Sequence, residues 1–295
     1  MLSRRSFLRA GLSLSVTGLI ARNGLAGTAA FDGSTVLAKL EATQGGRLGV
    51  AALDTATGSR IDHRADERFP LCSTFKFLAA AYVLARVDAG DETLDRVLTY
   101  GKGDIVAHSP ATAPRLGTGM TIGALCEATM TLSDNTAANL LLATFGGPEG
   151  LTRYLRSLGD DITRLDRIEP ALNEATPGDP RDTTSPAAML ATMHRLLLGD
   201  ALSPASRRML THWLVANQTG DNRIRAGVPA AWKVGDKTGG GAYGTTNDIS
   251  ILWPQGRAPV LLAVYLTETN AAAADREATI AQVARTISKE GWPHP

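Results

Sequence analysis

The sequence predicts an α/β fold of the α+β type, with an antiparallel sheet that is split in the sequence. Two β-type segments come early, at 47–54 and 59–64, and three more come late, between 231 and 266. The stretch between them, 73–226, is mainly helical. Helical segments also flank the first and last strands, so terminal helices can cover one face of the sheet. We therefore expect two lobes, with ligands bound where they meet.

Each element follows from periodicity and from turn residues. The run RLGVAALD, the turn TATG and the returning run form a β-hairpin. Proline and glycine separate the helical segments of the insertion, expected at 74–89, 121–127, 134–145, 148–158, 185–198 and 203–216. The late strands are expected at 231–241, 248–253 and 260–266, and the flanking helices at 34–40 and 271–289. The α/β lobe would comprise 31–72 and 227–295, and the all-α lobe 73–226.

The N-terminus has the layout of an export signal. Arg4 and Arg5 precede a mildly apolar stretch, and small residues follow up to Ala26 or Ala30. The twin arginine indicates the Tat route, whereas the alternative is a basic N-terminal helix. We expect a Tat-type signal peptide over 1–26, with its end between 26 and 30, a mature domain over 27–295, and a periplasmic location.

The composition excludes several classes of partner. The net charge is +1, from 30 basic and 29 acidic residues, and no basic block suits a nucleic acid or a membrane surface. No apolar run is long enough to span a bilayer. The five histidines have no metal-ligand spacing, and no nucleotide-binding motif is present. We expect a monomer with no nucleic acid, no stable membrane association, no metal and no cofactor. One pair of cysteines is not a disulfide framework, and free thiols are expected.

The run FPLCSTFKF places a hydroxyl and an amine one helical turn apart in an apolar segment. Ser73 and Lys76 share a helix face at the i, i+3 spacing. Apolar neighbours would desolvate the amine and lower its pKa, which suits a base or a polarising group beside a nucleophile. Alone, the pair is better explained as a snorkelling lysine beside a buried serine.

Two further motifs follow in order. Ser133-Asp134-Asn135 stands just before an apolar helical run and by itself reads as a helix cap. Lys237-Thr238-Gly239 lies on an expected strand, followed by two more glycines that allow a ligand to approach the backbone. Together, S-x-x-K, S-D-N and K-T-G are the set described for class A β-lactamases and penicillin-binding proteins.

On these motifs the whole mature chain resembles a class A serine β-lactamase. The resemblance implies a β-lactamase/transpeptidase-like fold and hydrolysis of the amide bond of penicillins and cephalosporins, which confers antibiotic resistance. It implies that Ser73 attacks the β-lactam carbonyl, while Lys76, or a glutamate acting through water, takes its proton. Ser133 would pass a proton to the departing nitrogen. The substrate is a small-molecule β-lactam.

A glutamate distinguishes an enzyme that hydrolyses its acyl-enzyme from relatives that only form it. The stretch 164–184 holds three prolines without a clear period, which is typical of a functional loop. Within it, Glu169 and Asn173 match the E-x-x-x-N of the family's omega loop and would activate water for deacylation. Arg167 and Asp182 match positions that the family pairs at the neck of this loop.

The resemblance also implies a set of binding residues. Lys237 and Thr238 would hold the substrate carboxylate, and the backbone N–H groups of Ser73 and Gly240 would form the oxyanion hole. Asn135 would bond the acylamino side chain. Arg223 resembles an arginine that some members supply to the carboxylate pocket, where others use the position of Thr246. His108 falls where many members have an aromatic residue at the cleft rim.

This chain departs from the family at its cysteines. Cys126 matches a disulfide position of some members, but Ala80 stands at the partner position. In some carbapenem-hydrolysing members, the cysteine at the position of Cys72 forms a disulfide with the position held here by Gly241. Gly240 also lacks the hydroxyl often found in broad-spectrum members, so carbapenem turnover has no support in the sequence.

Two rivals share the three motifs. A penicillin-binding carboxypeptidase or transpeptidase would act on cell-wall peptides, and Glu169 argues against it. A sensor domain would acylate and remain trapped, and the absence of a transmembrane run argues against that reading.

Overall fold

The computed structural model describes residues 33–290. The chain divides after Ala30, and everything below belongs to the second unit, Phe31–Pro295. The expected signal peptide, its cleavage site and the last five residues lie outside the described residues.

Five antiparallel strands form the main sheet, in the order β2-β1-β9-β8-β7. The strands are β1 (Arg47–Asp54), β2 (Arg60–His63), β7 (Lys233–Gly240), β8 (Thr246–Trp253) and β9 (Val260–Thr267). The early and late parts of the chain join through β1 and β9, whose register runs from Arg47↔Thr267 to Asp54↔Val260. The split antiparallel sheet is therefore confirmed, and the expected strand ends were right to within two residues.

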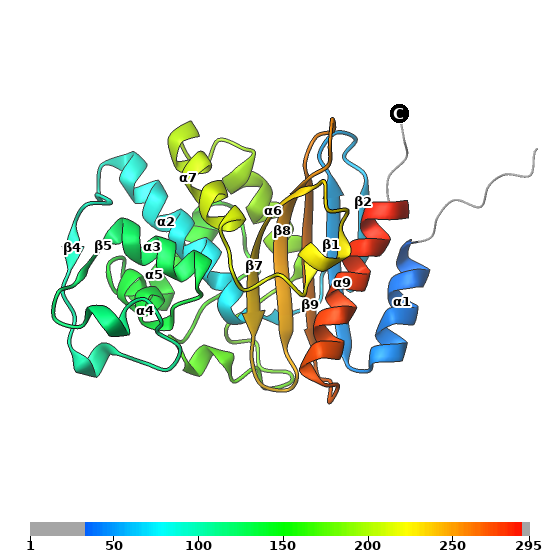
Figure 1. Cartoon of the computed structure of the whole chain (residues 1–295), viewed down its shortest axis with the longest axis horizontal. Helices are drawn as coiled ribbons and strands as arrows, with labels where there is room; N and C mark the ends of the chain where they lie inside the picture. Colours follow the sequence, from blue (N-terminus) through cyan, green and yellow to red (C-terminus); the bar gives the residue numbers. More distant parts are fainter. Residues whose placement is uncertain (1–32, 291–295) are drawn as a thin grey trace, which may run out of the picture. The chain divides into compact units, whose positions relative to one another are not determined.

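The terminal helices cover one face of this sheet (Figure 1). They are α1 (Gly33–Gln44) and α9 (Ala273–Glu290), and the short helix α8 (Ile224–Gly227) packs against α9. Their apolar residues meet those of the strands in a cluster that includes Leu37, Val264 and Ile280, all fully buried. The helix α1 runs four residues past the expected end at 40, because Leu40 still packs on this cluster.

The inserted part forms the helices α2 (Phe75–Ala89), α3 (Ile122–Thr131), α4 (Asn135–Ala143), α5 (Gly147–Ser157), α6 (Pro186–Leu197) and α7 (Pro204–Val215). Two-residue strands pair within or beside it: β3 (Phe69–Pro70) with β6 (Thr183–Thr184), and β4 (Val97–Leu98) with β5 (Met120–Thr121). The 3-10 turns are η1 (Cys72–Thr74), η2 (Lys102–Asp104), η3 (Ala113–Arg115) and η4 (Ala171–Asn173). The helix α6 contacts β1 and β9, so it covers the second face of the sheet and links the two lobes.

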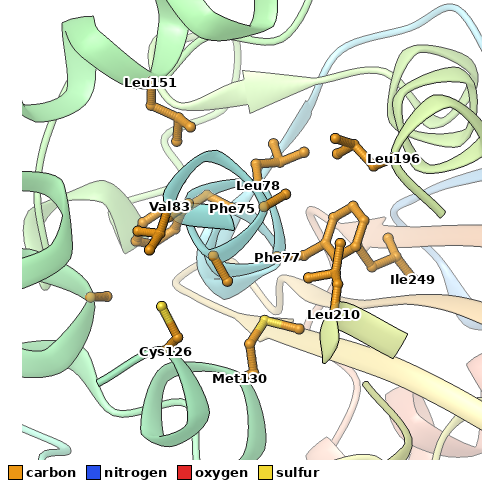
Figure 2. Close-up of a cluster of buried hydrophobic side chains, with 14 of the residues drawn as sticks. Phe75, Phe77, Leu78, Val83, Cys126, Met130, Leu151, Leu196, Leu210 and Ile249 are labelled. Atoms are coloured by element: carbon orange, nitrogen blue, oxygen red, sulfur yellow. The ribbon is translucent and has the colours of Figure 1, made fainter. Parts of the chain in front are cut away.

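The helix α2 is the centre of the larger core. Its side chains are apolar on all sides, which is the pattern of a buried helix. Figure 2 shows Phe75, Phe77, Leu78 and Val83 pointing outward in different directions from α2. They meet residues of the surrounding elements, which include Cys126, Met130, Leu151, Leu196, Leu210 and Ile249. This packing fixes the helix whose first turn follows Ser73.

Cys72 and Cys126 are both buried and free, as expected. No helix within residues 33–290 has the length and apolarity needed to cross a membrane. In the same part of the chain, no group of three or more His, Cys, Asp or Glu residues is arranged to hold a metal ion.

Candidate active site

Ser73 stands where the backbone turns sharply into the central helix. It is the middle residue of the 3-10 turn η1, which runs directly into α2. Cys72 has a φ of +43°, a value that non-glycine residues rarely adopt and that clusters at functional sites. Buried Cys72 and Thr74 flank the half-buried serine, so its neighbours anchor the turn while its hydroxyl stays within reach of the cleft. The N-terminal end of α2 also adds a partial positive charge there.

Lys76 is fully buried and makes hydrogen bonds only to oxygen atoms of the site. Its Nζ donates to Ser73 Oγ at 3.0 Å and to Asn135 Oδ1 at 2.5 Å. It also donates to the carbonyl oxygen of Ser133 at 2.8 Å. Burial lowers the pKa of Lys76, and the nearby Glu169 carboxylate opposes that shift. The lowered pKa follows from the apolar neighbours, as the sequence predicted.

Glu169 completes a compact triangle with the serine and the lysine. Its Oε1 accepts from Ser73 Oγ at 3.3 Å and lies 3.1 Å from Lys76 Nζ. Its Oε2 accepts from Asn173 Nδ2 at 2.5 Å. The Glu169 and Lys76 side chains are both 0% exposed, so this ion pair is shielded from solvent and each charge is held by the other.

The omega loop carries Glu169 and is closed at its neck by a buried carboxylate. Segment 164–184 contains only η4 and β6 as regular structure, as its prolines predicted. Asp182 is 1% exposed and accepts hydrogen bonds from the backbone N–H groups of Asp166 and Arg167. It also pairs with the Arg167 guanidinium at 2.5 Å. The expected arginine–carboxylate pair is therefore present.

Asn139 is a residue of this site that the sequence reasoning missed. Its Oδ1 accepts from the backbone N–H of Glu169 at 2.9 Å, and its Nδ2 donates to the Glu169 carbonyl at 2.9 Å. It thus binds both backbone polar groups of Glu169. The signal available in the sequence was its position, four residues after Asn135 and therefore on the same face of α4.

Ser133 lies between the two lysines of the motifs. Its Oγ accepts from Lys76 Nζ at 3.3 Å and from Lys237 Nζ at 3.2 Å. Its φ is +57°, and the next residue, Asp134, caps α4 by accepting from the backbone N–H of Ala137. The cap reading of this motif is thus right for the aspartate, and the serine is left free to face the cleft.

Lys237 faces the same serine from strand β7. It is fully buried and donates also to the carbonyl oxygen of Thr238 at 2.9 Å. Burial, assisted by the charge of Lys76, lowers the pKa of Lys237 to about 7. Thr238 exchanges a 2.5 Å hydroxyl–hydroxyl hydrogen bond with Thr219, which the sequence reasoning did not single out because no local pattern links the two.

The glycine run at the end of β7 lets that strand lie directly against the serine turn. A Cβ at Gly239 would stand 3.2 Å from Thr74 Cγ2, and one at Gly241 would stand 2.7 Å from Cys72 Sγ. Cys72 and Thr74 are the residues on either side of Ser73 in the chain. The backbone of Gly240, which is exposed, therefore lies beside that of Ser73.

Arg223 reaches this strand from the segment before α8. Its Nη1 donates to the carbonyl oxygens of Gly239 and Asn247 at 2.9 and 2.8 Å. Its Nε pairs with Glu277 at 3.3 Å. The guanidinium is therefore fixed beside the K-T-G strand. Thr246, at the alternative position, accepts instead from Arg276 Nε.

Asn135 and His108 lie at the helical side of the cleft. The backbone N–H of Asn135 donates to the His108 carbonyl at 2.9 Å, and its Nδ2 donates to the Ala107 carbonyl at 2.9 Å. With its Oδ1 on Lys76, the Asn135 amide fixes the lysine as well as facing the cleft. His108 is exposed, and its Nε2 lies 3.1 Å from the carbonyl oxygen of Leu132. The structure thus brings together residues from all three motifs and the omega loop.

Comparisons with known proteins agree with this arrangement. The model of the β-lactamase enzyme family matches residues 34–290. The β-lactamase AST-1 of Nocardia asteroides is 51% identical over 250 residues, covering 85% of this chain and 81% of the relative. The carbapenem-hydrolysing β-lactamase KPC of Klebsiella oxytoca is 51% identical over 255 residues, covering 86% and 87%.

A solved structure has the same fold. The ancestral (GNCA) class A β-lactamase is 66% identical and superimposes with a TM-score of 0.86, covering 86% of this chain and 98% of that chain. The expected two-lobed β-lactamase fold is therefore confirmed. With a matching family model, close relatives and the same fold, this chain belongs to the class A β-lactamase family.

Proposed function

We propose that this β-lactamase opens the amide bond of penicillins and cephalosporins through an acyl-enzyme on Ser73. The observation that carries the proposal is the placement of Glu169. Its carboxylate lies within hydrogen-bonding distance of both the Ser73 hydroxyl and the Lys76 amine. One carboxylate can therefore serve both the formation and the hydrolysis of the ester.

Acylation begins with attack of Ser73 Oγ on the β-lactam carbonyl carbon. The hydroxyl proton leaves to Lys76 Nζ, 3.0 Å away, or to Glu169 through a water. The lowered pKa of Lys76 favours the first route, whereas the 3.3 Å contact between Ser73 Oγ and Glu169 Oε1 places the alternative base beside the same hydroxyl. The oxyanion that forms is held by the N–H groups of Ser73 and Gly240, which lie on adjoining segments.

Ser133 delivers the proton that the leaving nitrogen needs. As the carbon–nitrogen bond breaks, Ser133 Oγ gives up its proton to the nitrogen. It regains one from Lys76 or Lys237, whose amines lie 3.3 and 3.2 Å away. Both amines already donate to this oxygen, so the relay needs no rearrangement of the site.

Deacylation uses Glu169 and Asn173. Glu169 takes a proton from a water, which attacks the ester carbon, and the Ser73 oxygen leaves and recovers its proton. Asn173 fixes the carboxylate through its Nδ2. Its Oδ1 is buried and has no hydrogen-bond partner among residues 33–290, so it is an acceptor for that water.

Substrate binding is assigned to the strand side of the cleft. Lys237 and Thr238 take the substrate carboxylate, and Arg223 adds positive charge from behind the strand. Asn135 takes the acylamino group through its amide, and His108 forms part of the rim. These groups need no metal and no cofactor for the steps above.

The decisive test is pre-steady-state hydrolysis of nitrocefin by Glu169→Ala. We expect a burst of one equivalent, followed by turnover slower than that of the parent by about 10²–10⁴-fold. Mass spectrometry should then detect the acyl-enzyme on Ser73. A matched control is Glu149→Ala, because Glu149 is 84% exposed on α5.

Three outcomes would contradict the proposal in different ways. Deacylation of Glu169→Ala at the parent rate would remove the assigned role of Glu169. A single burst without turnover in the parent would favour the sensor alternative. Release of D-alanine from cell-wall peptides in preference to β-lactam turnover would favour the carboxypeptidase alternative.

We further propose export to the periplasm by the twin-arginine route and a monomeric state. The sequence features Arg4 and Arg5 and the following small residues support the export route. Replacing both arginines with lysine should leave activity inside the cell, and unchanged secretion would contradict the route. Sedimentation of the mature chain should give one species of monomer mass, and a dimer would contradict the second proposal.

A further inference from the structure

A groove on the outer side of α7 is lined by basic residues and by no carboxylate. It has a volume of about 470 Å³ and lies between α7, the start of β7 and the end of α6. Figure 1 labels these three elements. Its titratable lining residues are Arg207, Arg208, His212 and Lys233. We call it the α7–β7 groove.

Within residues 33–290, no carboxylate forms an ion pair with the positive charges of this groove. The only acceptor of the Arg207 guanidinium in that range is the carbonyl oxygen of Gly199, and Lys233 Nζ lies 5.1 Å from the centre of the Trp253 ring. Arg208 and His212 are exposed, and within residues 33–290 their side chains have no ion pair or hydrogen bond. By contrast, the neighbouring Arg225 pairs with the buried Asp236.

The arginines also occupy an unfavourable place in their helix. Arg207 and Arg208 are the fourth and fifth residues of α7, near its positive end, and its first turn has no acidic residue. Asp88 lies at the same helix end, but it accepts from Ser203 and Ser206 and does not line the groove. Proteins break such local rules mainly at functional sites, and an anion in the groove would remove the conflict.

The chemistry of the groove suits a phosphate group. Guanidinium groups bind the oxygens of a phosphate in pairs, and an ammonium adds a point charge. Arg207 and Lys233 are already held in place by Gly199 and Trp253, so less freedom is lost on binding. A volume of about 470 Å³ also leaves space beyond a bare phosphate ion. We propose that the α7–β7 groove binds a phosphate-class oxyanion, either inorganic phosphate or the phosphate of an ester.

This groove is separate from the catalytic cleft. Lys233 is the first residue of β7 and Lys237 the fifth, so they stand about 13 Å apart along an extended strand. In the described part of the chain, no hydrogen bond, ion pair or ring contact joins any of the four basic residues to a residue assigned to catalysis or to β-lactam binding. A test of phosphate binding is therefore independent of the β-lactamase mechanism.

Titration calorimetry of the full chain with sodium phosphate, against sodium chloride at equal ionic strength, tests the proposal. We expect saturable one-site binding that weakens as salt is added. The double variant R208Q/K233Q should bind at least about tenfold more weakly, because two of the three charges carried by Arg207, Arg208 and Lys233 are removed. The matched control R115Q/K102Q removes two exposed charges outside the groove and should change the affinity less than about twofold.

Two soluble probes and a membrane distinguish the source of the phosphate. Glycerol phosphate and inorganic phosphate are titrated separately, and sedimentation with phosphatidylglycerol vesicles forms the third arm. Binding of either soluble probe that is lost in R208Q/K233Q supports the proposal. Binding to vesicles alone overturns it in favour of a membrane surface. Heats no larger than those of chloride, or equal loss in R115Q/K102Q, also overturn it. Nitrocefin turnover within about twofold of the parent should confirm that both variants are folded.

Discussion

The two sides of the active site differ in how a buried positive charge is paired. On the helical side, the Lys76 amine lies 3.1 Å from the Glu169 carboxylate, and both are completely buried. On the strand side, Lys237 is just as buried, but its hydrogen bonds go to a hydroxyl and a carbonyl oxygen. The helical side therefore holds a closed ion pair suited to moving protons. The strand side holds a cation that an incoming carboxylate can complete.

This difference explains why one site contains two buried lysines. A buried charge without a partner is costly, so it persists where function requires it. Burial lowers the pKa of both amines, but only Lys76 has a carboxylate in contact to oppose the shift. Each of the following predictions changes one of the two sides, beginning with the largest expected effect.

Replacing Lys76 should disable the helical side. In Lys76→Met the Ser73 hydroxyl loses its hydrogen bond from Nζ, and Glu169 is left buried without its cation. We expect acylation by nitrocefin to slow by about 10²–10⁴-fold in single-turnover stopped-flow measurements. Lys102→Met is the control, since Lys102 is exposed. An unchanged acylation rate would exclude Lys76 as the base and leave that role to Glu169.

A pH profile should reveal the unpaired cation of the strand side. The pKa of Lys237 is lowered to about 7, so its positive charge is lost as the pH rises through that value. For a substrate with a carboxylate, kcat/KM should fall about tenfold per pH unit above it. The variant Lys237→Arg keeps its charge, and its profile should lack this fall. Identical profiles for the two proteins would contradict the assignment of the carboxylate to residue 237.

The free energy of unfolding should also depend on the protonation of Lys237, but it should rise with pH where kcat/KM falls. Because the folded pKa of Lys237 is below its ordinary value of 10.5, the unfolded chain binds more protons between about 7 and 10.5. This residue therefore makes the folded state more stable as the pH rises through that window. Urea unfolding between these pH values should show a steeper rise in the parent than in Lys237→Arg, because the lowered pKa of Lys76 adds a rise to both proteins.

Two of the aspartate–arginine pairs in the omega loop differ in burial and in hydrogen bonding. The Asp182 side chain is 1% exposed and accepts hydrogen bonds from two backbone N–H groups. The Asp179 side chain is 13% exposed, accepts from one backbone N–H and pairs with Arg181, which is 50% exposed. Asp182→Leu should lower the free energy of unfolding by about 3–5 kcal/mol, since it leaves the Nε of Arg167 and two backbone N–H groups without their acceptor. Asp179→Leu should cost no more than about 1 kcal/mol. Equal losses in urea unfolding would show that the neck pair does not hold the loop.

The smallest expected effect concerns the support of Thr238. In Thr219→Val the hydroxyl partner of Thr238 is lost, while the size of the side chain is kept. We expect KM for a penicillin to rise by about 2–10-fold with kcat nearly unchanged, as for one hydrogen bond. A fall in kcat without a change in KM would place Thr219 on the proton-transfer side instead.

The sequence predicted the fold and the meeting of the three motifs because both depend on local signals. Strand and helix periodicity located β1, β9 and α2, and the motif residues Ser73, Ser133 and Lys237 do converge. The split of charge between the two sides was not predictable. It depends on which side chains contact across the cleft, and contacts such as that of Asn139 with the Glu169 backbone have no local signature.

The same limit applies to the α7–β7 groove. Arg207, Arg208 and His212 have helical spacing in the sequence, but nothing in the sequence brings Lys233 beside them. The absence of carboxylate partners likewise becomes visible only when every neighbouring element is in place.

The ladder between β1 and β9 ties completion of the sheet to completion of the chain. Its first paired residues, Arg47 and Thr267, are 220 positions apart (267 − 47). At a synthesis rate of about 5–20 residues per second, β1 waits roughly 10–45 s for its partner. During that interval, the edge of β1 that later pairs with β9 has no strand to bind, and such edges promote aggregation. A chain that ends before β9 would therefore have an open sheet, and its larger core would lack Leu261, Ala263 and Tyr265.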